Sequence, residues 1–190
     1  AKMWITNSPM CDIAVVWAKN EEGHVVGCIV ERDMQGFSTP EIKGKWSLRA
    51  SITGELIFDD VEIPEANILP LAKGLKAPLS CLSSARYGIA CGALGAAMDC
   101  LHHAVEYSKE RKQFGKPLAA FQLTQKKLAE MLTELTKAQL LSLQLGKLNI
   151  EEKITPAQIS MGKRNNVETA LRIARESRQI CGAMGITGDF

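Results

Sequence analysis

The spacing of apolar residues changes near residue 76, and this change constrains the fold of the chain more than any other feature. Before it, apolar residues form short runs rich in β-branched and aromatic side chains, broken by Asn, Gly and Pro. After it, they recur every three or four positions over long segments. The first pattern is typical of strands and turns, and the second of amphipathic helices. We therefore expect an α+β protein with a boundary between residues 1–76 and residues 77–190.

The first part is expected to form an antiparallel β-sheet or partial barrel. Residues 13–17 and 25–30 are apolar runs of strand length, each followed by a turn-forming segment. The last strand is expected to end within residues 63–67, because Pro64 lacks a backbone donor and turns the chain.

The second part is expected to form three long helices of an up-down bundle. Breakers at Gly115 and at Pro156 separate them, and Thr155 before Pro156 is typical of a helix N-cap. Antiparallel bundles usually close with four helices, so we expect a fourth outside the given residues. The middle segment carries one apolar stripe, formed by Leu128, Met131, Leu132, Leu135, Ala138, Leu141, Leu145 and Leu148.

Charge and composition favour some ligand classes over others. The second part carries 15 basic and 10 acidic side chains, which suits phosphate-bearing ligands, although solvated helix faces produce the same excess. An arginine-rich run is absent from the sequence, which argues against nucleic-acid binding. No apolar stretch is long enough for a membrane span.

Cysteines and histidines give no indication of a metal site. The six cysteines show no Cys-x-x-Cys pair, so we expect reduced, buried thiols in an intracellular protein. His102 and His103 with Glu106 invite a metal interpretation, but adjacent histidines point in different directions on a helix. No metal is expected.

Two motifs stand out along the chain, residues 3–7 at its start and residues 110–115 between the first two expected helices. With these motifs in this order, the whole chain resembles the acyl-CoA dehydrogenase family. Residues 4–10, 44–51, 85–90 and 163–166 look most like its glutaryl-CoA dehydrogenases. The resemblance implies an FAD-dependent enzyme that oxidises the α,β bond of an acyl-CoA thioester, here with decarboxylation of glutaryl-CoA to crotonyl-CoA.

The resemblance assigns the flavin ring to Trp4, Ile5 and Thr6. A flavin needs a planar wall and a hydrogen-bond donor near its N5 atom, and residues two apart on a strand share a face. The three residues alone are more typical of an ordinary strand, and the accompanying motifs favour the flavin role. The resemblance also implies a homotetramer (a dimer of dimers), in which residues of one subunit contact the FAD bound mainly to an adjacent subunit. The further residues implied to bind FAD are Arg111, Gln113, Phe114, Gln122, Gln179, Ile180, Cys181, Gly182 and Ala183.

The last of these segments departs from the family pattern. Where relatives have Gly-Gly-Asn-Gly near the adenosine half of FAD, this chain has Ala183 and Met184 at the two middle positions. Glycines there also serve as ordinary helix caps, so both interpretations stay open.

The resemblance places the acyl-CoA substrate against the start of the first helix. Arg86 is expected to have a ligand or a carboxylate partner, because an unpaired arginine is costly to bury; a surface ion pair is the alternative. The residues implied to contact substrate are Leu79, Ser80, Cys81, Leu82, Ser83, Ser84, Ala85 and Arg86.

No residue of this chain is expected to be the catalytic base. The glutamate of the family lies in a Tyr-Glu-Gly-Thr segment, which is expected beyond Phe190. The resemblance also implies electron-transferring flavoprotein as the acceptor, in the mitochondrial matrix of a eukaryote or the cytoplasm of a bacterium. The alternatives are a short-chain acyl-CoA dehydrogenase, an oxidase of the same fold, and a non-catalytic binding or scaffold protein.

Overall fold

A computed structural model describes residues 1–188 as two compact units. The β unit extends from Ala1 to Ser80 and the helical unit begins at Cys81, within the first long helix. The strands are β1 (Lys2–Thr6), β2 (Ile13–Lys19), β3 (Val25–Glu31), β4 (Phe37–Ser38), β5 (Thr53–Phe58), β6 (Ile68–Lys73), β7 (Lys112–Gln113) and β8 (Lys116–Pro117). The long helices are α1 (Lys76–Glu110), α2 (Gln122–Ile150) and α3 (Pro156–Cys181). Short 3-10 turns are η1 (Ser8–Met10), η2 (Glu65–Asn67), η3 (Leu118–Ala120) and η4 (Gly182–Ile186).

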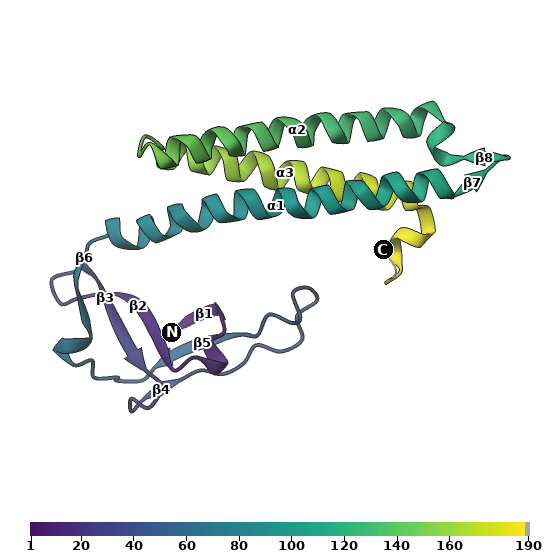
Figure 1. Cartoon of the computed structure of the whole chain (residues 1–190). Coiled ribbons are helices and arrows are strands. Elements are labelled where there is room, and N and C mark those ends of the chain that lie inside the picture. The colour runs from purple at the N-terminus through teal and green to yellow at the C-terminus, as the bar shows by residue number, and fades with distance from the viewer. Residues whose placement is uncertain (189–190) are drawn as a thin grey trace. The chain divides into compact units, whose positions relative to one another are not determined.

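The β unit contains two antiparallel three-stranded sheets, ordered β1–β5–β4 and β2–β3–β6 (Figure 1). Side chains alternate along β2, where Ala14 and Val16 are buried while Ile13 and Val15 are exposed. The expected antiparallel sheet structure is confirmed, and the described strands form no closed barrel. The buried core of the unit consists of Ala14, Val16, Cys28, Val30 and Leu56.

One expectation about the strands is wrong. The chain does not leave the sheet at residues 63–67 but makes the η2 turn there and continues as β6, which pairs with β3. Pro70 lies within β6. Because β6 is the outer strand of its sheet, the missing backbone donor does not interrupt the hydrogen bonding of a central strand.

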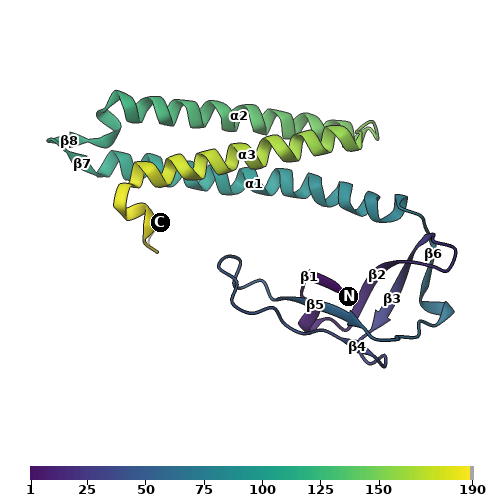
Figure 2. The same cartoon turned by 180° about the vertical axis from the view of Figure 1, so that it is seen from behind.

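The helical unit consists of three long helices that run alternately in opposite directions (Figures 1 and 2). Apolar side chains from all three meet in one core, whose members are Leu94, Ala97, Leu101, Met131, Leu135, Ala138 and Ile173. Buried alanines on α1 let its backbone approach the neighbouring helices. The glycines of α1 do not share this role, because a Cβ atom added at Gly88, Gly92 or Gly95 would meet no neighbouring atom within 4 Å.

The expected apolar stripe of α2 is only partly buried. Leu135 and Leu145 are 4% and 2% exposed, whereas Leu132 is 57% exposed. Leu140 and Leu143, which were not assigned to the stripe, are exposed too. The face of α2 that α1 and α3 cover is therefore narrower than the apolar stripe predicted from its sequence.

The start of α3 is fixed by a reciprocal pair of hydrogen bonds, as its sequence indicates. The backbone N–H of Gln158 donates to Thr155 Oγ1 at 3.3 Å, and Gln158 Oε1 accepts from the backbone N–H of Thr155 at 2.8 Å. This capping box satisfies two backbone donors that the helix itself leaves unpaired.

Replacing Thr155 with alanine should therefore lower the free energy of unfolding by about 0.5–2 kcal/mol. Thr133→Ala is the matched control, because the Thr133 hydroxyl only donates to the Ala129 carbonyl within α2. Urea unfolding followed by far-ultraviolet circular dichroism measures both. Equal midpoints for the two variants would contradict the capping role.

Candidate functional site

The β unit has a cavity of about 500 Å³ at the edge formed by β1 and the loop that precedes β5. Thr6 on β1 lies opposite Thr53 on β5, so both side chains are on one face of the sheet. Trp4 lines the same cavity and is 62% exposed. The expected grouping of Trp4 and Thr6 around one space is therefore observed.

The path of β1 at Trp4 differs from the regular strand that the sequence suggested. The register with β5 shifts between Lys2 and Ile5, and Trp4 has a φ of 63°. A bulky residue in this left-handed region is uncommon, and such positions concentrate at ligand sites. A bulge, rather than simple alternation, thus turns the Trp4 ring toward the cavity.

The loop of residues 44–53 forms the other wall of this cavity, and no site role was assigned to it from the sequence. The Lys45 ammonium group donates to Leu48 O at 2.9 Å, to Thr53 Oγ1 at 2.8 Å and to Ser51 O. These bonds hold the loop on β5 and leave Trp46 fully exposed at its tip. The sequence signal that could have found this wall is a tryptophan beside a lysine, outside any alternating strand pattern.

The connection between α1 and α2 is a tight hairpin that presents polar side chains. β7 and β8 pair through a two-residue turn, in which Phe114 and Gly115 have φ values of 51° and 79°. Positive φ at both positions is the geometry of a type I′ turn. Arg111 and Gln113 lie on this hairpin and are exposed, and so is Gln122 at the start of α2.

The end of α3 and the η4 turn show two kinds of surface. Ile180 is partly buried against the helical core and Cys181 is 6% exposed, so their side chains offer little surface to a ligand. Gln179, Gly182 and Ala183 are exposed.

The residues assigned to acyl-CoA lie along the first turns of α1. Leu79 and Leu82 are each 49% exposed, while Ser83 and Arg86 are half-buried. Arg86 Nη1 donates to Ser160 Oγ on α3 at 3.4 Å. The partner of Arg86 within the described residues is thus the hydroxyl group of Ser160, so of the two expected partners, a ligand or a carboxylate, no carboxylate of the described chain takes the role.

The two sets of predicted ligand residues in the helical unit lie at opposite ends of it. Arg111, Gln122 and Gln179 are at the end where α1 and α3 finish and α2 begins (Figures 1 and 2). Arg86 lies near the other end of α1, about 37 Å away along the helix axis at ~1.5 Å per residue. One flavin ring cannot contact both ends of the same bundle.

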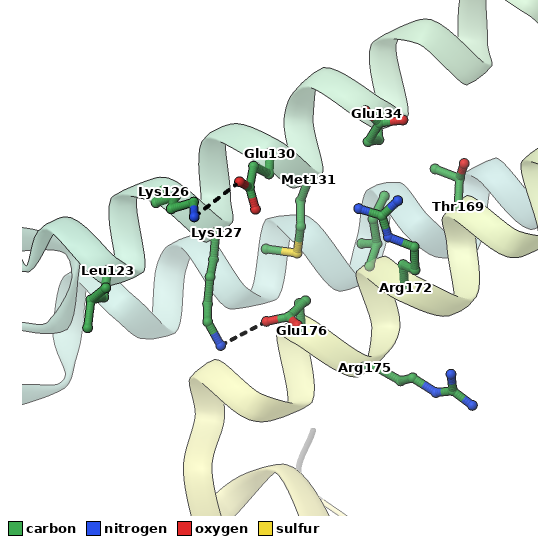
Figure 3. A pocket seen from close by; sticks show the side chains of 11 residues that line it. Leu123, Lys126, Lys127, Glu130, Met131, Glu134, Thr169, Arg172, Arg175 and Glu176 are labelled. Carbon is green, nitrogen blue, oxygen red and sulfur yellow. Dashed lines mark ion pairs between the residues drawn. The ribbon is translucent and has the colours of Figure 1, made fainter.

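A groove of about 380 Å³ lies between α2 and α3 (Figure 3) and contains none of the predicted site residues. Lys127 on α2 and Glu176 on α3 form an ion pair across it at 2.8 Å, whereas Arg175 points away (Figure 3). Hydrogen bonding from Lys137, aided by the nearby charge of Arg172, lowers the pKa of the Glu134 carboxyl. A carboxylate with a lowered pKa is a weak base, so Glu134 is poorly suited to proton abstraction.

Three shielded cysteines and Glu106 are poorly suited to nucleophilic or base chemistry. Burial raises the pKa of the Cys28, Cys100 and Cys181 thiols, which makes them poor nucleophiles. A hydrogen bond from Lys109 lowers the pKa of Glu106. Within the described chain, no group of three His, Cys, Asp or Glu side chains is placed to hold a metal, and none of the helices is apolar enough over sufficient length to cross a membrane.

Two family profiles cover almost the whole sequence. "Acyl-CoA dehydrogenase, middle domain" matches residues 1–61, and "Acyl-CoA dehydrogenase, C-terminal domain" matches residues 72–190. The chain belongs to the acyl-CoA dehydrogenase family. The resemblance seen in its motifs is thereby confirmed at the level of the family.

Curated and solved acyl-CoA dehydrogenases match the chain along its full length. It is 35% identical to the short-chain-specific enzyme of Megasphaera elsdenii, over all of this chain and 51% of that protein. It is 32% identical to the mitochondrial isovaleryl-CoA dehydrogenase of Arabidopsis thaliana, over 47% of that protein. This chain therefore spans about half the length of these relatives.

A glutaryl-CoA dehydrogenase from Mycobacterium smegmatis, solved in complex with FADH2, is more similar in sequence. It shares 50% identity with a TM-score of 0.95, over 99% of this chain and 48% of that one. An electron transferring flavoprotein structure from Acidaminococcus fermentans matches with 35% identity and a TM-score of 0.90, over 99% of this chain and 51% of that one. The expected acyl-CoA dehydrogenase fold is confirmed by these matches.

Proposed function

We propose that the β unit and the helical unit are the middle and C-terminal parts of an FAD-dependent acyl-CoA dehydrogenase that acts on glutaryl-CoA. The observation that carries this proposal is the 50% identity to a glutaryl-CoA dehydrogenase bound to FADH2. Lower identity to a short-chain enzyme makes a short unbranched acyl-CoA the second candidate substrate. Both candidates imply the same oxidation of the α,β bond.

The cavity of the β unit fits the flat ring of a flavin. Trp4 offers an exposed aromatic wall, and the hydroxyl groups of Thr6 and Thr53 lie on the same face of the sheet. In this arrangement Trp4 and Ile5 would border the ring, and Thr6 would donate a hydrogen bond to it. FAD bound there would accept the hydride that leaves the β carbon of the thioester.

The start of α1 suits the CoA thioester. Leu79 and Leu82 expose apolar surface, and Ser80, Ser84 and Arg86 add polar groups on the same turns. We assign residues 79–86 to substrate binding on this basis. The α proton would be removed by a glutamate of the family's Tyr-Glu-Gly-Thr segment, and the oxidised glutaryl substrate would then lose its distal carboxylate as CO₂ and take up a proton at the carbon that held it, to yield crotonyl-CoA.

The hairpin end of the helical unit is proposed to serve the FAD of a neighbouring subunit. Arg111, Gln113, Phe114 and Gln122 are exposed there, and Gln179 with the η4 turn lies at the same end. Because this end lies about 37 Å along α1 from Arg86, one flavin ring cannot contact both sets of residues in the same bundle. A homotetramer built as a dimer of dimers accounts for both sets.

Electrons would leave the reduced enzyme to electron-transferring flavoprotein. The similarity to a structure bearing that name supports a partner of this class. Relatives include mitochondrial and bacterial proteins, so we propose the mitochondrial matrix for a eukaryotic source and the cytoplasm for a bacterial one.

Replacing Trp4 with alanine in the full-length protein should weaken FAD binding about two- to tenfold, because an aromatic contact contributes about 0.5–1.5 kcal/mol. Trp4→Phe keeps a planar wall and should retain most of the affinity. Flavin absorbance after dialysis against graded FAD concentrations measures both. Unchanged FAD affinity in Trp4→Ala would mean that the flavin ring does not bind against Trp4 in this cavity.

The reaction itself is tested by product analysis. The full-length protein with FAD should convert glutaryl-CoA to crotonyl-CoA and CO₂ faster than it oxidises butyryl-CoA or isovaleryl-CoA. Faster oxidation of butyryl-CoA would favour the short-chain alternative. Rapid reoxidation of the reduced flavin by O₂ rather than by electron-transferring flavoprotein would identify an oxidase. A full-length protein that binds no flavin would favour the non-catalytic binding or scaffold alternative.

A further inference from the structure

Asn166 is completely buried at the meeting point of the three helices. Its side-chain amide donates to the backbone carbonyl of Ala90 on α1 at 3.0 Å and to Ser142 Oγ on α2 at 2.7 Å. Its side-chain oxygen accepts from Asn165 Nδ2 at 3.1 Å. The side chain is 0% exposed, so these protein groups take the place of water.

Two more contacts hold the same stretch of α1. Arg86 donates to Ser160 on α3, and Tyr87 packs against α2 at Gly146. A Cβ atom added at Gly146 would lie 2.8 Å from the Tyr87 hydroxyl oxygen, so a larger residue there would force this ring to shift. The segment from Arg86 to Ala90 is thus attached to both neighbouring helices.

A buried polar contact fixes helix register more sharply than apolar packing does. Leucine and alanine surfaces tolerate small shifts of one helix along another at little cost, whereas a shift of α1 would leave the Asn166 amide unpaired. Ala90 follows Arg86 by one helical turn, about 6 Å along the axis. The hydrogen bond from Asn166 to the Ala90 carbonyl therefore fixes the position of Arg86 along the axis of the bundle.

We propose that Asn166 is a positioning residue that places Arg86 for binding of the acyl-CoA thioester. This inference rests on the proposed function, because it takes residues 79–86 as the substrate segment. Asn166 itself touches no substrate: it acts through the backbone of α1, together with Ser142 as its partner on α2. Loss of Asn166 should weaken substrate binding while the chemistry of the bound complex and the retention of FAD stay the same.

The experiment uses the full-length, FAD-loaded protein and glutaryl-CoA. Asn166→Ala should raise KM by about three- to tenfold, with kcat changed less than about twofold, as expected for one lost buried hydrogen-bond node. Ser142→Ala, which removes only one partner, should raise KM in the same direction and decides the matter if Asn166→Ala does not fold. Thr169→Val is the matched control, because Thr169 is a buried polar residue of α3 that lines the α2–α3 groove.

A double-mutant cycle separates positioning from general loosening. If Asn166 acts through Arg86, adding Asn166→Ala to Arg86→Ala should not raise KM further. Hydrogen exchange of the α1 amides near residues 86–90 should accelerate in Asn166→Ala and Ser142→Ala but not in Thr169→Val. This measurement reports on the contact without any substrate.

The outcomes distinguish two failures. If the parent protein and Thr169→Val turn over glutaryl-CoA, Arg86→Ala raises KM, and Asn166→Ala and Ser142→Ala do not, the positioning role is overturned alone. A KM effect of Asn166→Ala that multiplies with that of Arg86→Ala overturns it as well. If the parent turns over no acyl-CoA, or Arg86→Ala leaves KM unchanged, the proposed substrate segment is wrong and the inference fails with it.

Discussion

With FAD and glutaryl-CoA supplied, residues 1–190 alone are expected to react at least about 10²-fold more slowly than a longer form that includes the Tyr-Glu-Gly-Thr segment, since a positioned base contributes about 10² to 10⁴ in rate. The cavity around Trp4 and Thr6 has no carboxylate among its lining side chains. Glu106 and Glu134 have lowered pKa values because lysines hydrogen-bond to them, which makes both weak bases. These observations disfavour Glu106, Glu134 and the lining of this cavity as the base, which supports a base in the Tyr-Glu-Gly-Thr segment.

The assay compares the two forms at equal flavin content, so that a difference reflects proton abstraction and not loss of FAD. Exchange of the α proton of the thioester with deuterated water reports this step directly. A Glu→Gln variant within the Tyr-Glu-Gly-Thr segment is the control and should react as slowly as residues 1–190. Equal exchange by all three proteins would show that a carboxylate of the present chain is the base.

Replacing Leu135 with alanine should lower the free energy of unfolding of the helical unit by about 2–5 kcal/mol, the usual range for a buried leucine. Leu135 is 4% exposed and belongs to the core that all three helices form. The neighbouring Leu132→Ala is the control, because Leu132 is 57% exposed and should change stability by less than about 0.5 kcal/mol.

Urea unfolding followed by far-ultraviolet circular dichroism compares the midpoints of the two variants with that of the parent. A similar loss of stability in both would mean that the whole stripe of α2 is buried in solution, for example against a further helix or a second subunit. That result would contradict the present packing of α2 and would agree with the broader stripe that its sequence suggests.

Most elements with local signals were predictable. The change of period near residue 76 separates the strands from the helices, and Thr155 with Gln158 forms the expected cap because its partners are three residues apart. The predicted end of the last strand was wrong because the strand that follows depends on a partner distant in sequence. Pro64 marks a turn correctly, but β6 exists because β3 offers it a free edge.

The candidate site was predictable where a motif carries it. The motif around Trp4 and Thr6 identified one wall of the cavity, while the opposite wall, residues 44–53, was missed because only the fold brings it beside β1. The hydroxyl partner of Arg86 was not predicted either. The hydroxyl of Ser160 lies beside it only because α3 returns along α1.

The sequence by itself determined that strands precede helices, where α3 begins and which family the chain belongs to, because these depend on periodicity, capping residues and short motifs along the chain. Only the tertiary structure decided which leucines of α2 are buried, how the bulge at Trp4 turns its ring, and that Asn166 joins three helices. Periodicity states which side of a helix is apolar. How much of that side is covered depends on where neighbouring helices lie, and contacts between residues as distant as Ala90 and Asn166 set those positions.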